Sequence, residues 1–187
     1  MQIKKKIIFE KKIDMLKFPI FLFIPFIFGI QTPNNNDTPI IIHFEQILNE
    51  YRDSNGLNPV KIDHSMKEFT DLRSKSLVSD YSHNGFNKNL RSYITNFTVG
   101  GENIAMLINA PNDNKPYWSS DIEEVGKILN KMAMGTSTNY DVAMYCFLLW
   151  NNSKSHNDLL LNNKVKRFYL SYEKSKTFYY FCFVGLD

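Results

Sequence analysis

The chain carries only two cysteines, Cys146 and Cys182, in 187 residues. Domains held together by several disulfides need more cysteines than this, so the fold must rest on a hydrophobic core. Apolar residues make up 43% of the sequence, which is enough for one sizeable core and short of two domains at this length. Both cysteines lie in strongly apolar runs, where two buried free thiols and one helix-to-strand disulfide are equally consistent with the sequence.

An uncharged apolar run from Phe18 to Ile30 follows a basic leader that ends at Lys17. Basic, apolar and then polar residues in this order are typical of a secretory signal peptide. The run is interrupted by prolines and is shorter than the ~20 apolar residues that a membrane-spanning helix needs, so we expect cleavage rather than retention. Met15, as an alternative start, would give the leader an ordinary length. The expected organisation is a signal peptide at 1–30, a linker at 31–42 and one folded domain at 43–187.

The charge distribution argues against nucleic acid as a partner. The formal net charge is +3, but many of the lysines crowd the start of the chain and the remainder is close to neutral. We therefore expect a secreted, extracellular protein whose partner is another extracellular protein or a lipid, with membrane contact only if the N-terminal segment is retained. In that compartment Asn36, Asn96 and Asn151, which each begin an Asn-X-Ser/Thr pattern, would be candidate glycosylation sites.

After the linker, the hydrophobic pattern changes from helical spacing to β-rich runs. Ile47, Leu48 and Tyr51 recur at helical spacing, and Asn55-Gly56 then supplies a stop. Residues 142–150 are almost wholly apolar, so their helix must be buried on most sides. The last two runs are β-rich and flank a short polar segment, which predicts an antiparallel hairpin. The expected elements are helices at 42–51, 63–78, 122–134 and 140–152, strands at 99–108, 165–172 and 177–184, and a loop at 81–88.

Several short segments follow one another in a specific order and spacing. They are ILNEYR (47–52), GLNP (56–59), ID (62–63), YSHNG (81–85), GENIA (101–105) and WNNSKSH (150–156). Together they resemble a CAP domain, the fold of cysteine-rich secretory proteins, antigen five and pathogenesis-related proteins. The resemblance covers residues 43–184 and is closest to the cysteine-poor, SCP-like members. It implies an α+β fold, a three-layer α/β/α sandwich with a small antiparallel sheet between helices.

The resemblance also implies a site. It brings together His83 on a loop, Glu102 on a strand and His156 at a helix end, in a shared polar cleft. Two imidazoles and one carboxylate are a suitable ligand set for zinc with one open position. The same groups could act as an acid and base pair, or form a hydrogen-bonded network that only ties three elements together.

The sequence departs from the family pattern near this site. Animal and plant members carry a second glutamate on the helix that bears Trp150, and they place their second histidine in a Gly-His-Tyr-Thr-Gln motif; neither feature is present. Ser153 falls near the glutamate's position, so only three members of the cluster remain. Asn103, Trp150 and Ser153 are expected to support the structure rather than to bind a ligand. The helical stretch at 122–134 is a candidate insertion beside the cleft.

We assign no catalytic residue, because no activated nucleophile accompanies the trio. The leading hypothesis is a secreted CAP-domain protein that binds a partner, a lipid or a divalent ion without catalysis. Zinc is the one cofactor considered, bound weakly through His83, Glu102 and His156 and lost on acidification. The alternatives are a metal-assisted, protease-like extracellular hydrolase and a membrane-anchored structural surface module.

Overall fold

The structure is a computed structural model that describes residues 39–108, 123–176 and 178–187. The expected signal peptide and most of the expected linker lie outside these ranges. Among the described residues, no helix is long and apolar enough to cross a membrane. The elements are α1 (Pro39–Ser54), β1 (Lys61–Ile62), the 3-10 helix η1 (His64–Met66), α2 (Lys67–Leu77), α3 (Asn84–Tyr93), β2 (Gly100–Ile108), α4 (Glu123–Ala133), α5 (Asn139–Asn151), α6 (Lys154–Leu160), β3 (Arg167–Lys174) and β4 (Phe178–Leu186).

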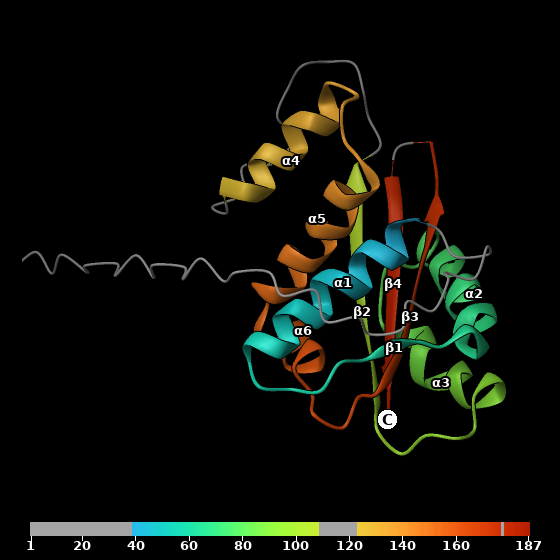
Figure 1. Ribbon diagram of the computed structural model, residues 1–187. Coiled ribbons are helices and arrows are strands. Elements are labelled where there is room, and N and C mark those ends of the chain that lie inside the picture. Colours follow the sequence, from blue (N-terminus) through green and yellow to red (C-terminus); the bar gives the residue numbers. More distant parts are fainter. Residues whose placement is uncertain (1–38, 109–122, 177) are drawn as a thin grey trace, which may run out of the picture. The chain divides into compact units, whose positions relative to one another are not determined.

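The described elements form three layers, with the sheet between helices (Figure 1). Helices α1, α5 and α6 lie on one side of the sheet, and α2 and α3 lie on the other. The strand order is β1-β3-β4-β2. Strands β3 and β4 form the expected antiparallel hairpin, and β2 pairs antiparallel with β4 along its whole length. The expected α+β sandwich is therefore present.

One part of the sheet differs from the expectation. The two-residue strand β1 pairs parallel with the start of β3, through Lys61 opposite Arg167 and Ile62 opposite Phe168. The sheet is consequently mixed rather than wholly antiparallel. A pairing this short leaves no periodic pattern in the sequence, so only the tertiary structure reveals it.

The core is built around aromatic side chains from helices α1 and α5 and from the face of the sheet that these helices cover. Phe44 of α1 packs edge-on against Trp150 of α5, with ring centroids 5.5 Å apart. Phe183 of β4 contacts the same two rings, and it stacks on Phe168 at 5.5 Å. All four residues are at most 1% exposed. Burying side chains of this size contributes about 1.5–3 kcal/mol each, so this cluster fixes α1 and α5 on the sheet.

The helix boundaries follow local capping chemistry. Helix α1 begins at Pro39, three residues before the expected start, since a proline is tolerated in the first turn of a helix. Gly56 follows α1 with φ +69°, the left-handed conformation expected of the Asn-Gly stop. Helix α5 begins with a capping box in which Thr138 and Asp141 satisfy each other's backbone groups.

Two helices were not expected from the sequence. Residues 81–88 were expected to be a loop, but α3 begins at Asn84, immediately after His83. Its apolar residues Phe86 and Leu90 are four apart and both buried, although the surrounding asparagines and serines make the segment resemble a loop. Helix α6 is the second, and it is polar except at its C-terminal end. His156 therefore lies within a separate helix and not at the end of the helix that bears Trp150.

Candidate functional site

A buried ion pair lies at the centre of the candidate site. Strand β2 brings in Glu102, whose side chain is 1% exposed, and α2 brings in Arg73, whose side chain is 4% exposed. Arg73 Nε lies 2.7 Å from Glu102 Oε1, and Nη2 donates a hydrogen bond to Oε2 at 3.2 Å. The Nε contact is an ion pair without hydrogen-bond geometry, because this N–H points away from the carboxylate oxygen. Arg73 thus neutralises the carboxylate that the sequence singled out.

His83 occupies the residue just before α3 and joins this pair. Its Nδ1 lies 2.9 Å from Glu102 Oε2, and since a carboxylate can only accept, Nδ1 carries the proton. Arg73 also donates to the backbone carbonyl of Ser82, the neighbouring residue. The loop before α3 is therefore held by the same two charged groups. The His83 side chain nevertheless remains 53% exposed, so its ring is available to solvent.

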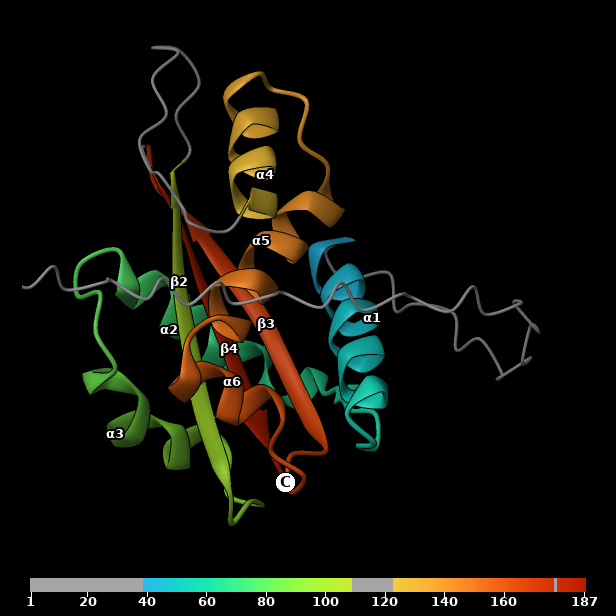
Figure 2. The same cartoon turned by 90° about the vertical axis from the view of Figure 1, so that its left-hand side faces the viewer.

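His156 approaches His83 from α6, which lies against β2 (Figure 2). The two imidazole centroids are 6.2 Å apart, with the rings inclined by 45°. Burial, and then the neighbouring His83, lower the pKa of His156 below its ordinary value. Asn103 donates to the backbone carbonyl of His156 at 3.1 Å. Because successive side chains of a strand point to opposite faces, Glu102 and Asn103 tie β2 to the helices on both sides.

The close approach of α6 to β2 depends on Gly101. A Cβ atom at this position would lie 2.9 and 3.0 Å from the two δ-carbons of Leu159 in α6. Real side chains do not tolerate such distances without a shift of their neighbours. The missing side chain at Gly101 therefore makes room for Leu159 of α6 to pack against the strand that carries Glu102.

Trp150 and Ser153, two of the expected supporting residues, make different contacts. Trp150 is 1% exposed and donates its indole N–H to the carbonyl of Ile104 at 3.0 Å, so its indole is part of the core. Ser153 occupies the N-cap position of α6 without a side-chain capping bond, and its hydroxyl instead lies 3.5 Å from that of Ser155. Ser153 therefore stands at a helix cap, as a supporting residue would, without a capping bond from its own hydroxyl.

The three expected zinc ligands do not form a three-ligand zinc site. Within the described ranges, no group of three histidine, cysteine, aspartate or glutamate side chains is placed to hold a metal ion. The contacts of Glu102 explain this result, because Arg73 and His83 already engage both of its carboxylate oxygens. A cation would have to compete with the Arg73 guanidinium for the only carboxylate. The two imidazoles remain as the only members of the trio that are free to bind.

Both cysteines are free and buried, which resolves the alternative that the sequence left open. Cys182 of β4 lies 3.5 Å from Glu102 Oε1, yet burial and the adjacent carboxylate raise the pKa of its thiol well above the ordinary value. Burial likewise raises the pKa of Cys146. Thiols with raised pKa values are poor nucleophiles, so Cys182 adds no reactive group to the site.

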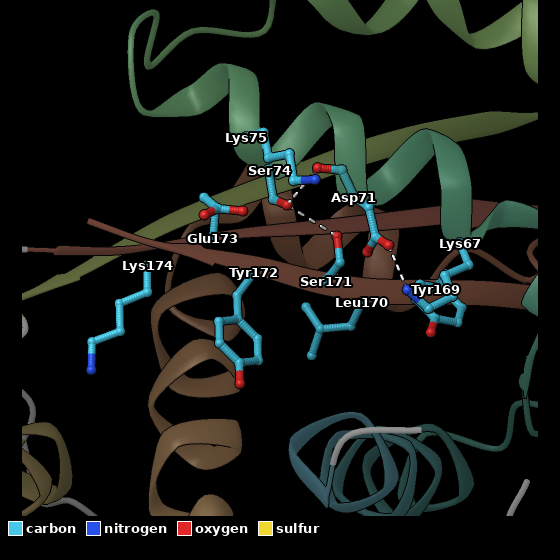
Figure 3. A pocket seen from close by; sticks show the side chains of 10 residues that line it. All are labelled: Lys67, Asp71, Ser74, Lys75, Tyr169, Leu170, Ser171, Tyr172, Glu173 and Lys174. Carbon is cyan, nitrogen blue, oxygen red and sulfur yellow. Dashed lines mark hydrogen bonds and ion pairs between the residues drawn. The ribbon is translucent and has the colours of Figure 1, made fainter. Parts of the chain in front are cut away.

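Arg73 is the residue that the sequence did not reveal. It lies in the expected helix at 63–78 beside Ser74 and Lys75, where a basic residue normally points into solvent. Its partner Glu102 lies 29 residues further along the chain, so no local spacing reports the pairing. The trio also lines no part of the cavity that the structure shows between α2 and β3 (Figure 3).

Comparisons with known proteins agree with this architecture. The chain is similar in structure to an outer surface protein of Borrelia burgdorferi, with 18% identity, a TM-score of 0.52, and coverage of 78% of this chain and 90% of that one. It is also similar to a cysteine-rich secretory protein of Staphylococcus aureus, with 17% identity, a TM-score of 0.50 and coverage of 81% of this chain. This chain spans only 40% of the staphylococcal protein. No curated protein matches the sequence. Residues 45–186 match the profile of the cysteine-rich secretory protein family, CAP, and the chain belongs to that family.

Proposed function

We propose that this protein is a secreted CAP-domain protein that binds a ligand without catalysing a reaction. The observation that carries the proposal is the state of Glu102, whose two carboxylate oxygens are already engaged by Arg73 and His83. A general base needs a free proton-accepting atom within reach of its substrate. Glu102 instead acts as a buried carboxylate that positions His83, and the exposed imidazole of His83 and the half-buried imidazole of His156 form the recognition surface.

The ligand that this surface fits is an extracellular protein or lipid that contacts His83 and His156. A divalent ion is a second candidate, because two imidazoles 6.2 Å apart on separate elements can both turn towards one ligand. Two neutral imidazoles are an incomplete shell, so affinity for zinc should be weak and should decline as the histidines become protonated. The metal-assisted hydrolase is less well supported, since the carboxylate it would use is neutralised by Arg73.

Secretion is part of the same proposal. It is supported by the order of basic, apolar and polar residues before position 39, and by the outer-surface and secretory descriptions of the two similar structures. N-terminal sequencing of secreted material should find a first residue between Ile30 and Thr38. Recovery of an uncleaved Phe18–Phe28 segment in a membrane fraction would contradict this and would favour the anchored surface module.

The binding proposal is tested by nuclear magnetic resonance of the mature domain at pH 7, titrated separately with zinc chloride and with phosphatidylcholine vesicles. Binding should shift the imidazole resonances of His83 and His156, and His83→Gln and His156→Gln should each weaken it. His43→Gln is the matched control, because this imidazole lies on α1 beside Tyr140. Cleavage of a peptide panel that is abolished by both site variants but not by the control would overturn the non-catalytic assignment.

A further inference from the structure

One edge of strand β3 is largely unpaired. Strand β1 covers only its first two residues, Arg167 and Phe168. Beyond Phe168, β4 pairs with one side of β3, and the described residues place no strand on the other. The opposite edge of the sheet, β2, is treated differently. Side chains of α5 donate to its carbonyls at Ile104 and Met106.

The backbone groups on the unpaired side of β3 can be identified from its pairing with β1. The carbonyl of Phe168 accepts a hydrogen bond from the backbone N–H of Asp63 at 2.8 Å, so it faces that side. Since strand geometry repeats every two residues, the N–H and C=O groups of Leu170, Tyr172 and Lys174 face the same way. Among the described residues, none of these groups has a partner on this side. Leu170 is buried whereas Lys174 is exposed, so the edge opens towards the hairpin.

A cavity of about 390 Å³ runs between this edge and α2 (Figure 3). Its volume lies at the lower end of the ~300–1,000 Å³ that is typical of ligand pockets, which suits a short extended segment. Figure 3 shows Ser171 and Glu173 directed towards α2, while Tyr172 and Lys174 point to the other face of the sheet. The α2 wall is formed by one face of the helix, at Lys67, Asp71, Ser74 and Lys75.

The charges along this cavity are unevenly balanced. Lys67 forms an ion pair with Asp71 at 2.5 Å, so these two charges compensate each other. At the hairpin end, neither Lys75 nor Lys174 has a carboxylate partner among the described residues, and the Lys174 ammonium rests 5.2 Å from the centre of the Tyr179 ring. Glu173 is the only acid lining that end. At this end, therefore, one ammonium group without an ion-pair partner among the described residues lies on each face of the sheet, Lys75 on the α2 side and Lys174 on the other.

We propose that the edge of β3 binds an extended acidic peptide segment of a partner protein by strand addition. The peptide backbone would pair with the N–H and C=O groups of Tyr172 and Lys174. Because its side chains would alternate between the two faces of the sheet, one acidic side chain would lie near Lys75 and a neighbouring one near Lys174. This surface shares no residue with the His83, Glu102 and His156 cluster, so it stands or falls independently of the proposed ligand-binding function.

The test uses a blocked heptapeptide, Glu-Glu-Thr-Val-Thr-Glu-Glu, with two neighbouring glutamates at each end so that either strand direction brings one glutamate to each lysine. Amide hydrogen exchange of the isotope-labelled mature domain is measured with and without a saturating peptide concentration. Strand addition should slow exchange at Tyr172 and Lys174 at least fivefold. The Ser171 and Glu173 amides, which already face β4, should not change, and this alternation is the signature of edge pairing.

Matched controls separate backbone pairing from charge attraction. The same peptide methylated on alternate backbone nitrogens should not bind, and replacement of all its glutamates by lysine should weaken binding. The double variant Lys75→Glu/Lys174→Glu should lose about tenfold in affinity, a loss equivalent to ~1.4 kcal/mol. Lys164→Glu/Lys166→Glu, which changes two exposed lysines outside the cavity, should bind as the wild type does.

Two results would overturn the proposal. One is unchanged exchange at Tyr172 and Lys174 at millimolar peptide, or equal binding of the methylated peptide. The other is concentration-dependent protection of the same amides without peptide, together with a dimer in sedimentation, which would assign the edge to a second copy of the chain.

Discussion

Removing the positive charge of Arg73 should destabilise the protein far more than removing an exposed arginine. Arg73→Met keeps an unbranched apolar stem but leaves Glu102, whose side chain is 1% exposed, as a buried carboxylate without a cation. Breaking a buried ion pair on one side costs about 3–5 kcal/mol, because the remaining charge has lost its hydration and its partner. For a chain of this size that corresponds to a fall in Tm of about 6–20 °C.

The double variant Arg73→Met/Glu102→Gln isolates this cost. It removes the stranded charge and should lose only about 1–2 kcal/mol, mainly because the Ser82 carbonyl no longer has its charged donor. The double variant should therefore be more stable than Arg73→Met by about 2–3 kcal/mol. The single variant Glu102→Gln completes the double-mutant cycle, which gives the coupling energy of the pair.

Urea unfolding at pH 7, followed by tryptophan fluorescence and by circular dichroism, gives the free energies needed. Arg91→Met is the control, because Arg91 lies on the exposed face of α3 over the Phe97 ring and should cost no more than about 1 kcal/mol. A double variant no more stable than Arg73→Met, or an Arg73→Met variant as stable as the control, would refute the reasoning that Glu102 depends on Arg73.

Three further outcomes follow from the described contacts. The pKa of His156 is lowered in the folded state, so on acidification the unfolded chain takes up this proton at a higher pH than the folded protein does. The contribution of His156 to stability should therefore decline as the pH falls below ~6.5. His156→Gln should remove this part of the pH dependence of urea unfolding, and an unchanged dependence would contradict the assignment. Trp150→Phe removes the indole bond to the Ile104 carbonyl and should cost about 1–3 kcal/mol in the same assay, whereas a neutral result would mean that the carbonyl finds another donor. Both cysteine thiols should resist a thiol reagent such as 5,5'-dithiobis(2-nitrobenzoic acid) in the folded protein and react in urea, so rapid native labelling of Cys146 or Cys182 would show that the sites open.

The sequence predicted those parts of the fold that depend on long, uniform patterns. The apolar run 142–150 became α5, and the two β-rich runs at the C-terminus became the β3–β4 hairpin. Helix α3 was missed because only Phe86 and Leu90 of its apolar positions face the core, within a segment rich in asparagine. Its stability comes from packing on α2, and packing is not a property of the segment alone.

The candidate site was predictable to the extent that family resemblance named its members. His83, Glu102 and His156 could be named because they lie in short segments of recognisable order. Arg73 lies in no such segment, and its burial arises only when α2 packs on β3 and β4, which brings its side chain to Glu102 of β2. The electrostatic state of the site, which decides how Glu102 can act, could therefore be read only from the three-dimensional structure.

Gly101 makes room for α6 to pack on β2. The residue takes part in no hydrogen bond to either imidazole, yet the room left by its missing side chain is filled by Leu159. An alanine there would oblige the flexible end of the Leu159 side chain to turn aside. The packing of the helix that carries His156 on the strand that carries Glu102 thus depends on a side chain that is missing.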